Sequence, residues 1–239
     1  WAGTNDIIAK QLEMETIASY VHDGLRILDF GCGNGITAME LARRYDVHVL
    51  GIDYAGEMIN AANDLACNQK FMGSVQFQVG DVQSLAELSE KFDLIYTERT
   101  LINLPDWPAQ RDAIIALGSL LTNDGLYVMC ENSQDGLDRI NALRERVGCS
   151  KITPPWHNHY LKDSDIEQSS FPGLKSEGIN YYSSTYYFLS RVVNASLAQQ
   201  EGKEPQYDAP INQLALQLPA IGELGQGRIW LWRKASGTA

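Results

Sequence analysis

The segment that decides the fold is Leu28-Asp29-Phe30-Gly31-Cys32-Gly33-Asn34-Gly35, in which an apolar run meets three glycines at alternate positions. The run 26–30 predicts a short buried strand, and the pattern from Ile36 to Tyr45 predicts a helix directly after the loop. Glycines permit positive φ and let a backbone approach a ligand without an intervening Cβ. The sequence therefore predicts a ligand-binding turn between a strand and a helix.

Further strands and helices alternate along the chain after this turn. The expected strands are 47–53, 75–79, 92–97 and 126–130. The expected helices between them are about 57–68, 85–90 and 108–121. This alternation is typical of βαβ units and predicts an α/β fold with a doubly wound, mostly parallel sheet. In such a sheet ligands bind at the carboxyl ends of the strands.

The alternation of strands and helices is less regular after residue 132. A helix is expected over 135–147, a sixth strand at about 179–189 and a last strand at 228–233. These segments complete a seven-stranded, Rossmann-like sheet.

We expect a single domain over residues 1–239. Its cofactor-binding core would occupy about 22–132. Loop-rich and helical elaborations at about 148–175 and 190–226 would form a lid over the substrate.

Composition excludes several classes of partner. The formal net charge is -11, with 30 acidic against 19 basic residues, and there is no basic run. Nucleic-acid and anionic-membrane partners require clustered Lys and Arg, so neither is expected. No apolar run approaches the roughly 18–20 residues of a membrane span.

The cysteines indicate which cellular compartment and which metal sites to expect. The four are scattered, without zinc-ligand spacing: Cys32, Cys67, Cys130 and Cys149. No metal site is expected. The N-terminus shows no secretory pattern, and free thiols favour the cytoplasm.

The glycine loop alone leaves the cofactor open. Gly33-x-Gly35-x-x-Ala38, with Asp53 twenty positions after Gly33, also fits the loose fingerprint of nicotinamide-dependent oxidoreductases. Asp29 argues against that alternative, because a carboxylate at the strand end would repel a pyrophosphate. An acid there would attract the ammonium and sulfonium groups of S-adenosylmethionine.

An ordered set of motifs over about residues 25–132 resembles class I, Rossmann-like S-adenosylmethionine-dependent methyltransferases. Leu28–Gly35 resembles their motif I, and Gly51-Ile52-Asp53 resembles the post-I segment. Val79-Gly80-Asp81-Val82 resembles the motif beside the adenine, and Phe92–Tyr96 resembles motif IV. In the helix-turn-strand that follows, Thr122-Asn123-Asp124-Gly125 departs from the family's usual turn.

The resemblance implies roles toward the cofactor's amino acid and ribose. Asp29 and the backbone of Gly31, Gly33 and Gly35 would hold the methionyl end. Asp53 would accept hydrogen bonds from the ribose hydroxyls; the alternative is a helix-capping acid.

The resemblance also implies an adenine site. Tyr54 and Met58 would pack on the adenine face, although Met58 is equally suited to filling a gap in the core. Asp81 and the Val82 amide would bind the adenine edge.

Methyl transfer from a sulfonium is an in-line displacement, in which the protein supplies alignment and a base for the acceptor's proton. The candidate bases are Glu98, after the fourth strand, and His157 or His159, in a loop of the expected lid. The structural alternatives are an ion pair of Glu98 with Arg99 and ordinary loop hydrogen bonds for the histidines.

Candidate substrate contacts lie at strand ends, on the expected sixth strand and on the expected lid: Arg99, Asn103, Glu131, Trp156, Tyr186 and Arg191. Asn132 adjoins them at the end of the fifth strand. The expected reaction is O-methylation of a small polar or carbohydrate-type acceptor. N-methylation of a small metabolite, a nicotinamide-dependent oxidoreductase and a non-catalytic cofactor-binding module remain alternatives.

Overall fold

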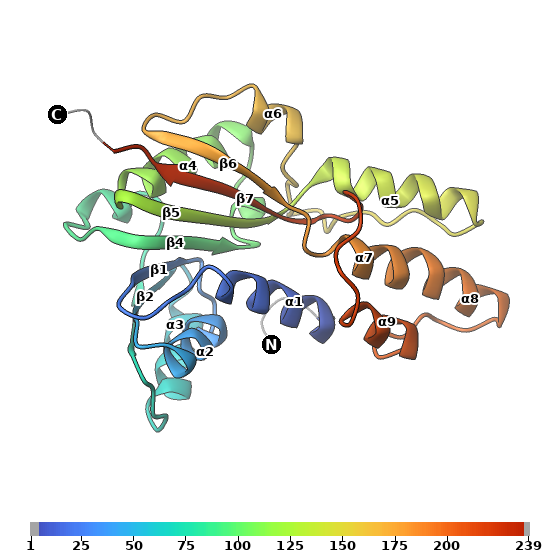
Figure 1. Cartoon of the computed structure of the whole chain (residues 1–239), viewed down its shortest axis with the longest axis horizontal. Coiled ribbons are helices and arrows are strands. Elements are labelled where there is room, and N and C mark those ends of the chain that lie inside the picture. The colour runs from blue at the N-terminus through green and yellow to red at the C-terminus, as the bar shows by residue number, and fades with distance from the viewer. Residues whose placement is uncertain (1–4, 237–239) are drawn as a thin grey trace.

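A computed structural model describes residues 5–236, which form a seven-stranded sheet with helices on both faces (Figure 1). The strands are β1 (Arg26–Phe30), β2 (His48–Asp53), β3 (Ser74–Val79), β4 (Phe92–Glu98), β5 (Leu121–Asn132), β6 (Leu174–Asn180) and β7 (Gly227–Lys234). Their spatial order is β3-β2-β1-β4-β5-β7-β6. Only β7 runs antiparallel to its neighbours, β5 and β6. The fold is the mostly parallel, doubly wound α/β fold expected from the sequence.

The helices include several short segments. The α-helices are α1 (Ile7–Ala18), α2 (Ile36–Arg44), α3 (Gly56–Ala66), α4 (Trp107–Ser119), α5 (Gln134–Arg146), α6 (Asp163–Glu167), α7 (Ser184–Tyr187), α8 (Ala195–Gln200) and α9 (Pro210–Ala215). The 3-10 helices are η1 (Ser84–Glu87) and η2 (Leu101–Asn103), and η3 (Phe188–Asn194) is π-helical.

The strand order reverses between β1 and β4, which lie side by side at the centre of the sheet. The chain runs outward from β1 through β2 to β3 and then returns to β4 on the other side of β1. Crossover helices leave opposite faces of the sheet at this switch point, so a crevice opens beyond the strand ends. The glycine loop after β1 therefore lies at the expected ligand-binding edge.

The expected sixth strand over 179–189 is wrong in position. The edge strand β6 ends at Asn180, and residues 184–200 form the continuous helical run of α7, η3 and α8. The tyrosine-rich segment has high strand propensity, but tertiary packing overrides it. Tyr186 and Tyr187 are buried against α1 and α5 in a core cluster that includes Ile8 and Ile140.

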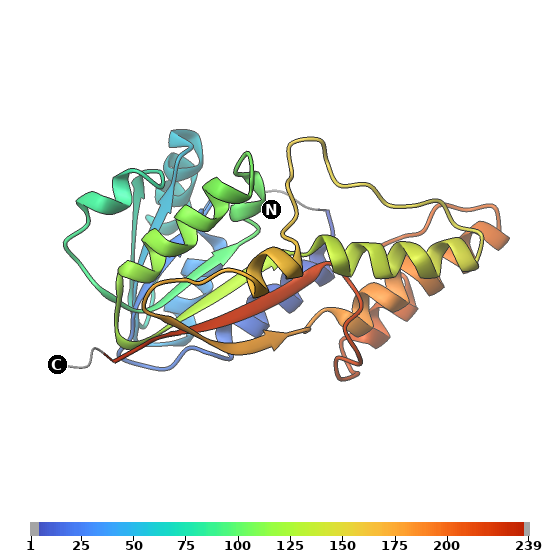
Figure 2. The same ribbon diagram turned by 90° about the horizontal axis from the view of Figure 1, so that it is seen from above.

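A helical lobe made of α5, α7, η3, α8 and α9 projects beyond the carboxyl ends of the strands (Figures 1 and 2). Residues 147–162 leave the far end of α5, return toward the sheet as an arching loop and descend to α6 (Figure 2). We call residues 147–162 the lid loop. With α1, the helical lobe and the lid loop surround the crevice.

Within residues 5–236, no helix is long and apolar enough to cross a membrane. The same residues contain no cluster of three His, Cys, Asp or Glu side chains suited to a metal ion.

Candidate active site

The glycine loop requires glycine at two positions for steric reasons. Gly31 and Gly35 have φ of +80° and +73°, in the left-handed region. A Cβ on Gly31 would lie 2.1 Å from the Thr100 side chain, and one on Gly35 would lie 2.4 Å from the Phe77 ring. The loop thus passes close under neighbouring elements, with its backbone open to the crevice.

Asp53, the last residue of β2, fixes the loop in place. Its Oδ2 accepts a hydrogen bond of 2.8 Å from the amide of Gly33, and its Oδ1 accepts one of 2.9 Å from the amide of Ala55. A carboxylate has about four lone-pair sites, so two remain for ligand hydroxyls. Asp53 is therefore both a loop anchor and a candidate ribose ligand.

A cleft of about 330 Å³ opens beside Asp53. We call it the small cleft; its lining includes Asp53, Tyr54, Asp81 and Val82. Asp81 accepts hydrogen bonds from the amides of Gln83 and Ser84, which hold the η1 turn. Tyr54 is 79% exposed and free to cover a ring.

Met58 does not fit its expected place. It is half-buried, and within the described residues it does not line this cleft.

A larger cavity of about 490 Å³ lies on the other side of the glycine loop. We call it the large cavity; it is enclosed by the glycine loop, α1, the end of β4, the lid loop and the helical lobe. Gly31, Arg99 and Asn103 line both the small cleft and the large cavity. The two spaces therefore meet at the end of β4.

Asp29 lines the large cavity at the start of the glycine loop and is 2% exposed. Burial raises its pKa to about 7, against the lowering effect of the neighbouring Tyr96 hydroxyl. The buried carboxyl is thus poised to ionise when a cation is placed beside it.

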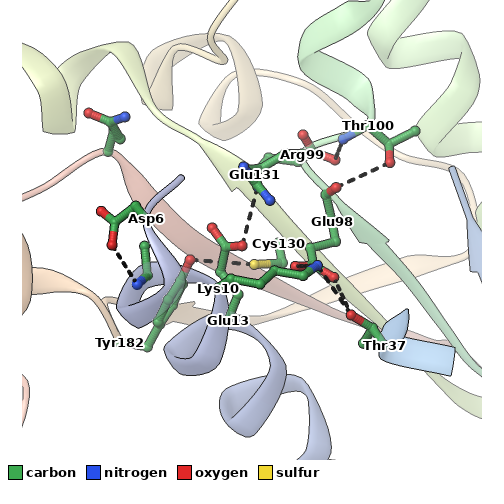
Figure 3. A network of polar contacts seen from close by, with 12 residues as sticks. Asp6, Lys10, Glu13, Thr37, Glu98, Arg99, Thr100, Cys130, Glu131 and Tyr182 are labelled. Carbon is green, nitrogen blue, oxygen red and sulfur yellow. Dashed lines mark hydrogen bonds and ion pairs between the residues drawn. The ribbon is translucent and has the colours of Figure 1, made fainter. Parts of the chain in front are cut away.

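Glu98, at the end of β4, is closed into an ion pair (Figure 3). Lys10, reaching over from α1, contacts its Oε1, and the Thr37 hydroxyl donates to its Oε2 over 2.8 Å. Burial opposes ionisation, but the Lys10 charge and the hydrogen bonds outweigh it and lower the pKa of Glu98. A carboxylate stabilised in this way is a weak base.

Glu13 and Arg99 form a second buried contact next to the first (Figure 3). The Arg99 Nε lies 3.2 Å from Glu13 Oε2. Burial raises the pKa of Glu13 to about 8, and the adjacent Glu98 charge adds to the rise. Arg99 itself has φ of +54°, an uncommon conformation for a non-glycine residue and one that concentrates at functional sites.

The Glu131 side chain binds backbone amides and is not among the described residues that line the large cavity. It is 1% exposed, and its carboxylate accepts hydrogen bonds from the amides of Thr100, Leu101 and Ile102. These bonds fix the η2 turn. Asn103, on that turn, accepts a 2.8 Å hydrogen bond from Asn158 and so connects the turn to the lid loop.

The two candidate histidines differ in position. His157 lines the large cavity, with Trp156 packed edge-on to its ring at 5.4 Å between centroids. Both histidines are exposed, but His159 is not among the described residues that line the cavity; its backbone amide donates to Ile102 and its carbonyl accepts from Gln110. Trp156 is 92% exposed. Of these three side chains, only His157 faces the cavity in the described structure.

Arg191 and Tyr186 bind the start of α1. The Arg191 guanidinium pairs with Asp6, and the Tyr186 hydroxyl donates to the same carboxylate over 2.5 Å. Arg191 also stacks on Tyr207, 4.9 Å from the ring centroid, and lines the large cavity. Tyr186 is 1% exposed and acts in packing and α1 docking.

Comparison with known proteins agrees with this geometry. A family model described as a methyltransferase domain matches residues 21–163. The chain belongs to the methyltransferase domain family. The cofactor of these class I enzymes is S-adenosylmethionine, so the family assignment favours it over the nicotinamide cofactor that the glycine loop alone left open.

Relatives in this family act on different acceptors. The chain is 38% identical over 86 residues to phosphoethanolamine N-methyltransferase 1 of Triticum aestivum, covering 36% of this chain and 17% of that protein. It is 35% identical over 154 residues to 27-O-demethylrifamycin SV methyltransferase of Amycolatopsis mediterranei, covering 62% of this chain and 56% of that protein. The chain therefore matches less than two thirds of either relative's length.

Solved structures share the fold across nearly the whole chain. The mycolic acid cyclopropane synthase CmaA1, complexed with S-adenosylhomocysteine, aligns with a TM-score of 0.61 at 15% identity, over 95% of this chain and 84% of that one. Magnesium protoporphyrin IX methyltransferase from Synechocystis PCC 6803 aligns with a TM-score of 0.57 at 16% identity, over 96% and 82%. At these identities the likeness concerns the fold.

Three site residues at the start of α1 were not predicted from the sequence. Asp6, the N-cap of α1, and Lys10 and Glu13 on the helix are spaced i, i+4 and i+7, and all three line the large cavity. Charged residues at that spacing share one face of a helix, and this pattern could have predicted that they face a common site.

Proposed function

We propose that this chain transfers the methyl group of S-adenosylmethionine to an oxygen of a small polar acceptor. The observation that carries the proposal is the meeting of the small cleft and the large cavity at Gly31 and Arg99. The adenosine would occupy the small cleft, and the acceptor would enter the large cavity from the side of the lid loop. The methyl group would then face the acceptor at the junction.

The residues at the glycine loop suit this cofactor. Asp29 would pair with the cofactor's ammonium, and Asp53 would bind the ribose hydroxyls. Asp81 and Val82 would bind the adenine edge, with Tyr54 covering the ring. S-adenosylmethionine supplies the reactive sulfonium, and the protein supplies position and charge.

His157 is the proposed general base for the acceptor hydroxyl. It is a histidine in the large cavity, and the competing candidate, Glu98, is held as a stabilised anion by Lys10. Methylation of an oxygen requires loss of its proton, which a neutral imidazole accepts near neutral pH.

The first test is calorimetric titration with S-adenosylmethionine, S-adenosylhomocysteine and NAD. Both sulfur compounds should bind with micromolar affinity and NAD should not. Asp53→Ala should weaken S-adenosylhomocysteine binding about 100-fold, because it removes charge-assisted hydrogen bonds to the ribose and releases the Gly33 amide.

Asp112→Ala is the matched control, because this acid on α4 has a side chain 74% exposed and should leave affinity unchanged. Binding of NAD alone would overturn the proposed function.

A further inference from the structure

The large cavity contains an amide oxygen that lacks a hydrogen-bond partner. Asn132, the last residue of β5, is 6% exposed and lines the cavity. Among the described residues, its Oδ1 finds no donor. Buried polar atoms are almost always paired, and an unpaired one is costly. An unpaired acceptor at the wall of a cavity indicates that a ligand supplies the donor.

Two further polar side chains adjoin Asn132. Gln226, just before β7, donates from Nε2 to the hydroxyl oxygen of Tyr160 over 3.3 Å. Tyr160 lines the same cavity, and the Asn132 side chain acts on the pKa of its hydroxyl in the lowering direction. Because the Tyr160 oxygen accepts from Gln226, the hydroxyl keeps its own hydrogen to donate.

The cluster therefore presents one free acceptor, Asn132 Oδ1, beside one free donor, the Tyr160 hydroxyl. A ligand hydroxyl both donates and accepts, so it satisfies both atoms. An ammonium cannot accept, and a carbonyl or carboxylate cannot donate.

The charged side chains near the cluster are paired with one another. Burial raises the pKa of Tyr160, and the positive charges of Arg99 and Arg191 act on the same hydroxyl in the lowering direction. Both arginines line the large cavity, and each is paired with a carboxylate, Arg99 with Glu13 and Arg191 with Asp6, so the choice of ligand rests on the hydrogen-bonding pattern.

We propose that Asn132, Tyr160 and Gln226 form a subsite for a neutral hydroxyl group of the methyl acceptor. This inference rests on the proposed function and deepens it, because it predicts an acceptor that carries a neutral hydroxyl group. The three residues are positioning residues. They orient the acceptor through this hydroxyl, and the displacement itself occurs at the methyl carbon, with the cofactor's sulfur as the leaving group.

The test is side-chain amide NMR of the full chain saturated with S-adenosylhomocysteine. The Asn132 amide signal is assigned by its absence in Asn132→Leu. Methyl α-D-glucopyranoside and phenol are the hydroxyl probes, and ethylammonium, which has no hydroxyl, is the ammonium probe. We expect a saturable shift with at least one hydroxyl probe and none with ethylammonium. Tyr160→Phe should weaken that binding about tenfold, as the loss of one hydrogen bond implies.

A shift with ethylammonium, or no shift with either hydroxyl probe, would overturn the subsite. S-adenosylhomocysteine binding is measured separately in the same samples. Its loss would instead count against the proposed function as a whole.

Thermal stability gives a second readout that needs no ligand. Asn132→Leu removes an unpaired buried acceptor and should leave the Tm unchanged or higher. Asn141→Leu is the matched control, because Asn141 is similarly buried but exchanges two hydrogen bonds with the Ile152 backbone. Its Tm should fall. An equal fall in both variants would make Asn132 a structural residue.

Discussion

The raised pKa of Asp29 makes the proposed contact with the cofactor's ammonium sensitive to pH. Its carboxyl has a pKa raised to about 7 by burial, so the neutral form gains population as pH falls through that value. Only the ionised form attracts an ammonium. The neighbouring charges of Glu98 and Asp53 raise the pKa of Asp29 further, and the charge of Lys10 lowers it.

We therefore expect S-adenosylhomocysteine to bind about tenfold more weakly at about pH 6 than at about pH 8, since one unit of pKa is a factor of ten. Binding at the lower pH should release a proton, which calorimetry in buffers of different ionisation enthalpy detects. Asp29→Asn should bind weakly with no such pH dependence. A wild-type affinity that stays flat across this range would show that Asp29 does not face the ammonium.

Local and long-range residues differed in how well the sequence predicted them. Asp29, Gly31 and Asp53 lie within motifs whose spacing is visible along the chain. The Lys10–Glu98 pair joins residues 88 positions apart, and nothing local to either residue predicts it. The sequence also could not predict that Glu131 fixes the η2 turn, because its partners are backbone amides about thirty positions earlier in the chain.

At the scale of elements, α1 is docked on the crevice through buried charge. Lys10 is 13% and Glu98 6% exposed in their side chains. Removing one partner of a buried pair leaves the other charge uncompensated, which costs far more than the loss of a surface pair.

Lys10→Met should lower the free energy of unfolding by about 3 kcal/mol, measured by urea denaturation. Adding Glu98→Gln should restore most of the loss, because it removes the stranded charge. Lys151→Met, in the exposed Lys151–Glu145 pair, should have little effect. Equal effects at Lys10 and Lys151 would contradict a docking role for the buried pair.

The lid loop provides a matched pair of histidines. His157→Ala should lower kcat about 100-fold, the usual contribution of a general base. His159→Ala should leave kcat unchanged, because His159 contacts neighbouring elements through its backbone. The assay follows release of S-adenosylhomocysteine with the hydroxyl compound that binds. A similar loss in both variants would indicate a general effect on the loop.

Strands and helices were predicted best where the hydrophobic pattern of a segment matched its place in the alternation of strands and helices. The first four strands and the last strand were confirmed within one residue at each end, but β5 begins at Leu121, five residues before the expected strand, and includes the segment 122–125 that was expected as a turn. Residues 184–194 were not, because their tyrosines have strand propensity while the buried environment between α1 and α5 selects a helix. The helical lobe has no sequence signature comparable to the glycine loop.

For the whole molecule, ligand binding should appear as added stability. S-adenosylhomocysteine at about 100 times its Kd stabilises the folded state by about 2.7 kcal/mol. For a chain of this size that corresponds to a rise in Tm of about 5–10 °C. NAD at the same concentration should leave the Tm unchanged, and a rise with NAD alone would contradict the cofactor assignment.

The position of β7 between β5 and β6 has a consequence for how the protein is made. Synthesis proceeds from the N-terminus, so β1 to β5 can assemble as a parallel sheet before the remainder emerges from the ribosome. β6 is made next, but its neighbour in the sheet is β7, which is made later. Until then β6 has no edge to join, and the exposed edge of β5 awaits β7. The nascent chain therefore carries an open sheet edge for a time, a surface that chaperones recognise and that other nascent chains can pair with.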